Sequence, residues 1–160
     1  MALQPGDRAP DFETLTHTGE KIQLSEVWAN SPVVLFFYPK AFTPGCTAEA
    51  CHFRDLRSEF EKVGARIFGV STDNVDKQSE FASEHGLSYT LLADPDGTVC
   101  KLYGVKRNLL PIAKRTTFVI DKGGEILEVV HNEFSMNVHA DRALEVLAAR
   151  GSDSDPENSS

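Results

Sequence analysis

Residues 33 to 51 read VVLFFYPKAFTPGCTAEAC: an apolar run is followed by a short loop and then by a segment that carries two cysteines. The run from Val33 to Tyr38 predicts a buried strand. Thr43 and Pro44 are residue types preferred at the N-cap and at the first position of a helix. The stretch therefore predicts a strand, a tight loop and a helix that begins beside Cys46.

Cys46 would lie in the first turn of this helix, where free N–H groups and the helix dipole favour an anion. A thiol in that position tends toward the nucleophilic thiolate. Burial as a small apolar group is the commoner role of a free cysteine. Three neighbours favour reactivity instead: Gly45 leaves the approach to the sulfur open, Thr43 offers a hydroxyl, and Cys51 follows five residues later.

The two cysteines would not touch on a regular helix. Apolar residues gather on one face of a helix predicted to run to about Glu61, namely Ala50, Phe53, Leu56, Phe60 and Val63. Helix geometry puts the Cα atoms of Cys46 and Cys51 about 8–9 Å apart, whereas a disulfide needs less than about 7 Å. A bond between them therefore requires the first turns to unwind, as in a disulfide that forms and breaks during a cycle.

The chain resembles the peroxiredoxins, and in particular the peroxiredoxin Q branch, also called bacterioferritin comigratory protein. The string F-Y-P-K-A-F-T-P-G-C-T-A-E-A-C contains the pattern P-x-x-x-T-x-x-C of that family. Further similar segments follow the family order along the chain: residues 9–12 (APDF), 69–73 (GVSTD), 91–97 (LLADPDG) and 115–121 (RTTFVID). The resemblance covers Met1 to about Arg150 and implies a thioredoxin-like fold without metal or haem.

The resemblance also implies roles for individual residues. Cys46 takes the peroxidatic position, and Cys51 takes the resolving position of many members of this branch. Thr43 and Arg115 take the positions that bind the peroxide, with the arginine also favouring the thiolate. Two further residues complete the expected site: Pro39 shields the sulfur from bulk water, and Glu49 lies inside the pattern with a less defined role. Without the family pattern, Arg115 would be expected to be a surface arginine at the start of a strand, because arginine is mostly exposed.

The chemistry of these residue types agrees with peroxide reduction. Thiolate attack on an O–O bond gives a sulfenic acid and an alcohol or water, and Cys51 would then condense with the sulfenic acid. Arg115 and Thr43 supply preorganised donors for the charge that spreads in the transition state. We therefore expect a thiol peroxidase for hydrogen peroxide and organic hydroperoxides, and the family resemblance implies thioredoxin or a glutaredoxin-type protein as its reductant.

Two other classes remain open. A thiol-disulfide oxidoreductase on the same fold typically carries Cys-x-x-Cys, whereas the gap here is four residues. A non-enzymatic peroxide sensor or holdase would change a binding surface when Cys46 is oxidised.

Cys100, in TVCKLYGV, is expected to be buried in a short helix, although some relatives place a resolving cysteine elsewhere. The loop Lys106–Lys114 contains Leu109, Leu110 and Ile112 and would be either a hydrophobic rim beside the site or local packing.

The composition is that of a small globular enzyme. The 160 residues suit a single domain, and 41% are hydrophobic. The net charge of −8 argues against nucleic acid and anionic membranes as partners. No apolar run is long enough to span a bilayer. No histidine spacing suggests a metal site, and no glycine-rich motif suggests a nucleotide. These features favour a cytoplasmic protein, and the family resemblance implies a monomer or a weak homodimer.

The predicted elements alternate along the chain. An N-terminal β-hairpin, with strands at 11–15 and 22–24, precedes the 33–38 strand and the cysteine helix. Further strands are expected at 65–71, 89–92, 116–120 and 125–131, and helices at 75–84 and 138–150, with Ala140, Leu144 and Leu147 facing inward. This order predicts an α/β fold with a central mixed sheet flanked by helices. Residues 1–150 would form the domain and residues 151–160 a disordered acidic tail.

Overall fold

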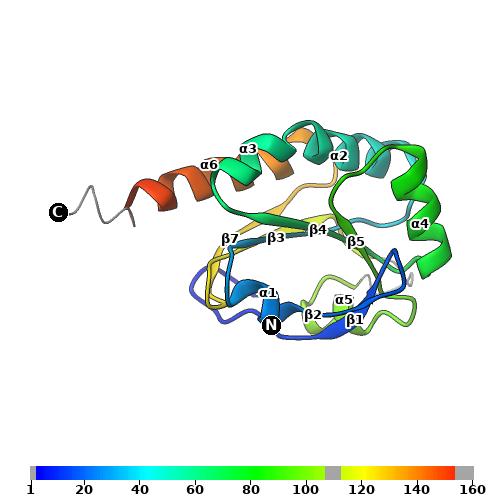
Figure 1. Cartoon of the computed structure of the whole chain (residues 1–160), viewed down its shortest axis with the longest axis horizontal. Coiled ribbons are helices and arrows are strands. Elements are labelled where there is room, and N and C mark those ends of the chain that lie inside the picture. Colours follow the sequence, from blue (N-terminus) through cyan, green and yellow to red (C-terminus); the bar gives the residue numbers. More distant parts are fainter. Residues whose placement is uncertain (1–2, 107–112, 154–160) are drawn as a thin grey trace.

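The computed structural model describes residues 3–106 and 113–153, which form a seven-stranded mixed sheet with helices on both faces (Figure 1). The strand order is β2-β1-β5-β4-β3-β6-β7. The strands are β1 (Glu13–Thr16), β2 (Lys21–Gln23), β3 (Val33–Phe37), β4 (Arg66–Ser71), β5 (Thr90–Ala93), β6 (Thr116–Ile120) and β7 (Ile126–His131). The thioredoxin-like arrangement and the N-terminal hairpin agree with the prediction from sequence.

The apolar run at the start of the cysteine segment lies in the middle of the sheet. Every residue of β3 is buried. This strand pairs with β4 in parallel and with β6 in the antiparallel sense. A strand covered on both faces needs apolar side chains on both, which is why β3 is a continuous apolar run and not an alternating one.

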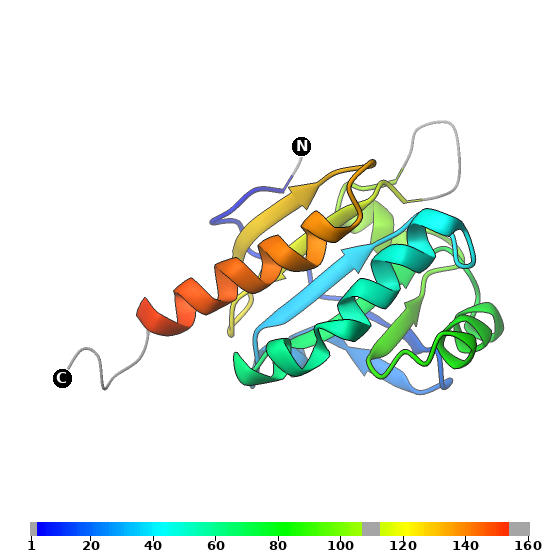
Figure 2. The same cartoon turned by 90° about the horizontal axis from the view of Figure 1, so that it is seen from above.

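The helices are α1 (Leu24–Trp28), α2 (Pro44–Asp55), α3 (Arg57–Lys62), α4 (Val75–Glu84), α5 (Thr98–Leu102) and α6 (Asn137–Asp153). In Figure 1, α2, α3, α4 and α6 lie over one face of the sheet, and α1 and α5 lie over the other. Figure 2 shows α6 and α2 side by side over the first of these faces, with β3 visible between them. The prediction missed α1 and assigned its first residue, Leu24, to a strand. Five residues are too short for a helical period to be read from sequence.

The cysteine helix differs from its prediction because it is interrupted at Leu56. The backbone of this residue has φ −96° and ψ 9°, so α2 ends at Asp55 and α3 begins at Arg57. Phe53 and Phe60 both remain fully buried, with ring centroids 5.8 Å apart. The break leaves the apolar face buried on both sides, and hydrophobic periodicity alone therefore gave no sign of it.

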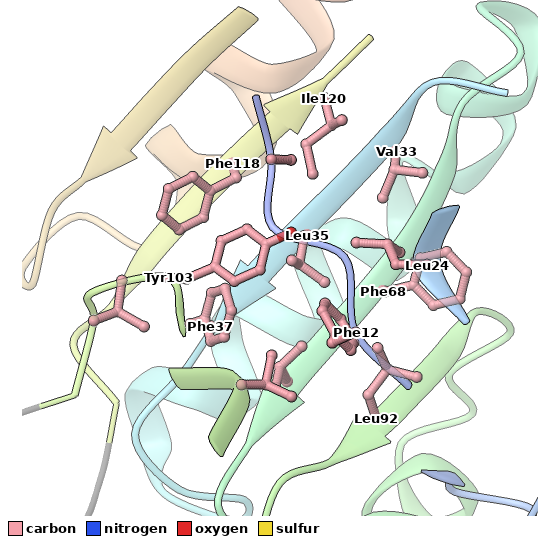
Figure 3. Packing of buried hydrophobic residues seen from close by; sticks show 14 of the residues in the cluster. Phe12, Leu24, Val33, Leu35, Phe37, Phe68, Leu92, Tyr103, Phe118 and Ile120 are labelled. Atoms are coloured by element: carbon pink, nitrogen blue, oxygen red, sulfur yellow. The ribbon is translucent and has the colours of Figure 1, made fainter. Parts of the chain in front are cut away.

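Two hydrophobic clusters fill the space on the two faces of the sheet. One packs beneath α1 and α5 and includes Leu35, Phe37, Phe118 and Tyr103 (Figure 3). The other packs beneath α2, α4 and α6 and includes Phe36 and Cys46. Because successive side chains of β3 point to opposite faces, the sheet separates the two clusters.

The ends of the chain bear on two further expectations. The helix α6 continues to Asp153, so the acidic segment predicted as disordered from residue 151 begins inside a helix. The rest of that tail, 154–160, and residues 107–112 of the Lys106–Lys114 loop lie outside the described residues. No helix in the described ranges is long and apolar enough to cross a membrane.

Candidate active site

Cys46 lies in the first turn of α2, where the sequence predicted it. Thr43 is the N-cap with an extended backbone, and Pro44 is the first helical residue. The Cys46 side chain is 1% exposed. Before the helix, Phe42 has φ 69°, a left-handed conformation that is costly for a bulky residue. Such strain in a loop indicates that the surrounding structure holds the helix start in one position.

Arg115 contacts the sulfur from the neighbouring part of the sheet. It precedes β6 and is 6% exposed, so the alternative of a surface arginine is wrong. Its Nη2 donates to Cys46 Sγ at 3.3 Å, and its Nη1 donates to Glu49 Oε1 at 2.7 Å. A single guanidinium therefore contacts both the thiol and a carboxyl group. This uses the planar fork of donors that distinguishes arginine from lysine.

Glu49 is one helical turn after Cys46 and is fully buried. Burial raises the pKa of this carboxyl to about 8, although the charge of Arg115 and its hydrogen bond act in the opposite direction. Its second oxygen, Oε2, has no hydrogen-bond partner among the described residues. The structure thus brings together Cys46, Arg115 and Glu49, three of the residues predicted for the site.

The other predicted residues surround this group. The Thr43 hydroxyl donates to the carbonyl of Lys40 at 2.9 Å, which leaves its oxygen able to accept a hydrogen bond. Pro39 is half-buried in the loop before the helix. A Cβ on Gly45 would lie 3.2 Å from Arg115 Nη2 and 3.4 Å from Met136 Sδ. The glycine therefore lets the guanidinium lie close to the helix start. The prediction from sequence was only that Gly45 leaves the approach to the sulfur open.

Cys51 lies on the same helix and is half-buried. The thiols of Cys46 and Cys51 are both free, and α2 is uninterrupted between them. Two side chains fix this part of the helix to its neighbours: the Tyr89 hydroxyl donates to Ala50 O at 2.8 Å, and Arg54 Nη1 donates to His85 O at 2.6 Å. The reduced protein therefore has the separated arrangement expected from helix geometry.

Cys100 is buried on the other face of the sheet, as predicted. Desolvation by its apolar surroundings strongly raises the pKa of its thiol, and the nearby charge of Asp94 acts in the same direction. The Asp94 carboxylate accepts from the backbone N–H groups of Val99 and Cys100, at 2.9 Å each. A thiol that stays protonated is a poor nucleophile, so these surroundings suit a packing role.

His139 is the residue at the site that the sequence interpretation missed. It is fully buried near the start of α6, with Nδ1 2.8 Å from Thr117 Oγ1 and Nε2 2.8 Å from Asn132 O. Its Nδ1 is 3.6 Å from Glu49 Oε2. The sequence contained one indication: His139 directly precedes Ala140, which was predicted to face inward on this helix. Its partners are distant in sequence, so no local spacing indicates what it contacts.

The remaining clusters and cavities do not compete with this site. His52, on α2, pairs with Asp141 on α6 at 2.8 Å. Within residues 3–106 and 113–153, no group of three or more His, Cys, Asp or Glu side chains could hold a metal ion. One cavity of about 630 Å³ lies between β1 and α5 and is lined by Phe12, Leu15 and Leu102 among others. Neither Cys46 nor Arg115 lines it.

A buried thiol at a helix start, contacted by an arginine on a thioredoxin-like sheet, defines a cysteine-based redox enzyme. The model of the AhpC/TSA family matches residues 5–129. Peroxiredoxin Bcp of Escherichia coli strain K12 is 39% identical over 151 residues, which cover 91% of this chain and 96% of that protein.

Solved structures agree with this assignment. Peroxidoxin BcpB from Mycobacterium tuberculosis superposes with a TM-score of 0.87 at 52% identity, covering 92% of this chain and 97% of that one. The bacterioferritin comigratory protein of Xanthomonas campestris, solved to study its alkyl peroxide reduction activity, gives a TM-score of 0.82 at 29% identity, with 94% and 98% covered. The chain belongs to the AhpC/TSA family and is a thiol-dependent peroxidase of the peroxiredoxin Q type.

Proposed function

We propose that Cys46 is the peroxidatic cysteine, that Cys51 is the resolving cysteine, and that the substrates are hydrogen peroxide and organic hydroperoxides. The observation that carries the proposal is the 3.3 Å contact between Arg115 Nη2 and Cys46 Sγ in a buried site at a helix start. This contact favours the thiolate, and the same guanidinium is close enough to the sulfur to bind an oxygen that reacts with it.

The first step is attack of the Cys46 thiolate on one peroxide oxygen. The O–O bond breaks, the sulfur is oxidised to a sulfenic acid, and the other oxygen leaves as hydroxide or alkoxide and takes a proton from water. Thr43 accepts a hydrogen bond from the peroxide O–H, and Arg115 and the helix N–H groups stabilise the negative charge on the departing oxygen. Pro39 and Gly45 shape the approach to the sulfur.

The second step joins the two cysteines of α2. The Cys51 thiol attacks the sulfur of the Cys46 sulfenic acid, an S–S bond forms, and the hydroxyl leaves as water. A dithiol protein of the thioredoxin type then reduces the disulfide by thiol–disulfide exchange.

We also propose that a glutaredoxin-type protein can act as the reductant, that this peroxidase is cytoplasmic, and that it acts as a monomer or weak homodimer. Three free cysteines suit a reducing compartment.

The test is consumption of micromolar peroxide by the reduced protein with a thioredoxin system. We expect turnover by the natural chain, none by Cys46→Ser, and at most a single turnover by Cys51→Ser before it over-oxidises. Cys100→Ser is the matched control and should turn over normally. Reaction with disulfides but not with peroxides would favour a thiol-disulfide oxidoreductase, and oxidation of Cys46 without turnover would favour a sensor.

A further inference from the structure

The buried histidine behind the site has a defined tautomer. His139 Nε2 lies 2.8 Å from the carbonyl oxygen of Asn132, which can only accept, so Nε2 carries the proton. Burial lowers the pKa of the imidazole, which keeps it neutral. Its Nδ1 therefore accepts from the Thr117 hydroxyl at 2.8 Å and has no proton to donate to Glu49 Oε2, which lies 3.6 Å away.

The absence of a proton on Nδ1 bears on which form of Glu49 fits. A carboxylate at this position would be a buried charge with one donor, Arg115 Nη1, while its Oε2 would have no donor among the described residues. A buried ionised oxygen without a donor is costly. A carboxylic acid carries no buried charge, keeps the hydrogen bond from Arg115 Nη1 to Oε1, and does not need a donor at Oε2.

The protonation state of Glu49 matters because Arg115 also donates a hydrogen bond to the Cys46 sulfur. An ionised Glu49 at 2.7 Å would offset the charge of the guanidinium that lies 3.3 Å from Sγ. A neutral Glu49 keeps its hydrogen bond to Arg115 and leaves the positive charge to the thiolate. We propose, on the basis of the function proposed above, that His139 is a positioning residue that holds Glu49 as a neutral acid and so keeps Arg115 available to Cys46.

Other charged and titratable groups also face this pair. Glu133, in the loop after β7, raises the pKa of Glu49, in the same direction as burial. Tyr89, directly before β5, also interacts with Glu49, and burial keeps the pKa of this phenol well above its usual value. His139 is affected by Arg115, His131 and Glu133, with burial as the main cause of its lowered pKa. These groups leave the proton on Glu49 and not on the imidazole.

The sign of the pH dependence follows from the direction of this shift. The pKa of Glu49 is raised to about 8, so the acid is present below that pH and is lost as the pH rises through it. Above about pH 8 the new carboxylate competes with the thiolate for Arg115. The rate constant of Cys46 with hydrogen peroxide should therefore fall on the alkaline side.

The experiment measures this rate constant against pH by rapid quenching of the remaining thiol. In His139→Asn the amide can turn an N–H toward Glu49 Oε2, which stabilises the carboxylate. The alkaline fall should then begin about one pH unit lower, and the rate constant just below pH 8 should drop by about threefold to tenfold. The matched control is His52→Asn, the same change at the His52–Asp141 contact between α2 and α6. The pH dependence of the rate constant of His52→Asn should match that of the natural chain.

A second measurement needs neither peroxide nor a His139 variant. Infrared spectra of the natural chain at neutral pH should contain a carboxylic acid band that disappears in Glu49→Gln. Absence of this band overturns the inference, as does a His139→Asn profile with an unshifted alkaline fall, or a natural chain without such a fall. If the natural chain does not react with peroxide at any pH, the proposed function fails, and the infrared result still decides the state of Glu49.

Discussion

At the scale of the residue, the site depends on a guanidinium with two partners. Cys46 and Thr43 could be predicted from a few consecutive residues, because a helix start is a local property of sequence. Arg115 follows 69 residues after Cys46 and was assigned only through the resemblance of its segment to a family. The contacts of Glu49 and His139 could not be predicted, since they depend on how α2, β6 and α6 pack together.

Removing the guanidinium should reduce the stabilisation of the Cys46 thiolate and slow its reaction with peroxide. In Arg115→Ala, Cys46 loses its donor, and we expect a smaller thiolate fraction at neutral pH and about 100-fold slower reaction with peroxide. Arg115→Lys should recover only part of this rate, because an ammonium does not reproduce the fork that reaches Sγ and Glu49 Oε1 together.

Thiolate absorbance titrated against pH and the rate constant with hydrogen peroxide measure these effects. Arg142→Ala is the matched control, because that side chain pairs on the surface with Glu128 and Glu145. A titration curve of Arg115→Ala that overlays the natural one would remove Arg115 from the site.

At the scale of the element, the proposed Cys46–Cys51 cycle requires α2 to unwind. It holds the two thiols on one rigid segment, and a regular helix keeps their Cα atoms about 8–9 Å apart. Tyr89 and Arg54 fix its middle, and the Phe53 ring stacks on Phe36 with centroids 4.3 Å apart. The amphipathic pattern predicted this helix. It could not predict the break at Leu56, where one residue leaves the helical conformation while the buried face continues.

Oxidation should unwind α2 and leave α3 in place. The disulfide form should show faster amide exchange from Thr43 to Arg54, because helix hydrogen bonds and the burial of Phe53 are lost together. Protection should persist in α3, which is separated by the break and held by the fully buried Phe60.

Hydrogen exchange followed by mass spectrometry compares the reduced and oxidised proteins, and β3 serves as the internal control. Equal protection across Thr43 to Arg54 in both states, with the Cys46–Cys51 bond confirmed, would exclude this motion.

At the scale of the whole molecule, the sheet separates the cysteines into two groups. Cys46 belongs to the cluster beneath α2, α4 and α6, whereas Cys100 belongs to the cluster on the other face. Alternating strand and helix signals predicted the fold class, and the apolar run of β3 predicted its central strand. The strand order depends on pairings between distant segments, which the sequence does not indicate locally. Because Cys100 lies on the other face of the sheet, we expect it to take no part in the proposed cycle.

The most direct test of this account is a disulfide map of the natural chain after one molar equivalent of hydrogen peroxide. Free thiols are blocked with an alkylating reagent, and the peptides are identified by mass spectrometry without reduction. The account predicts a Cys46–Cys51 disulfide and an alkylated Cys100. A bond between Cys46 and Cys100, or a Cys46 that remains a free thiol, would contradict it.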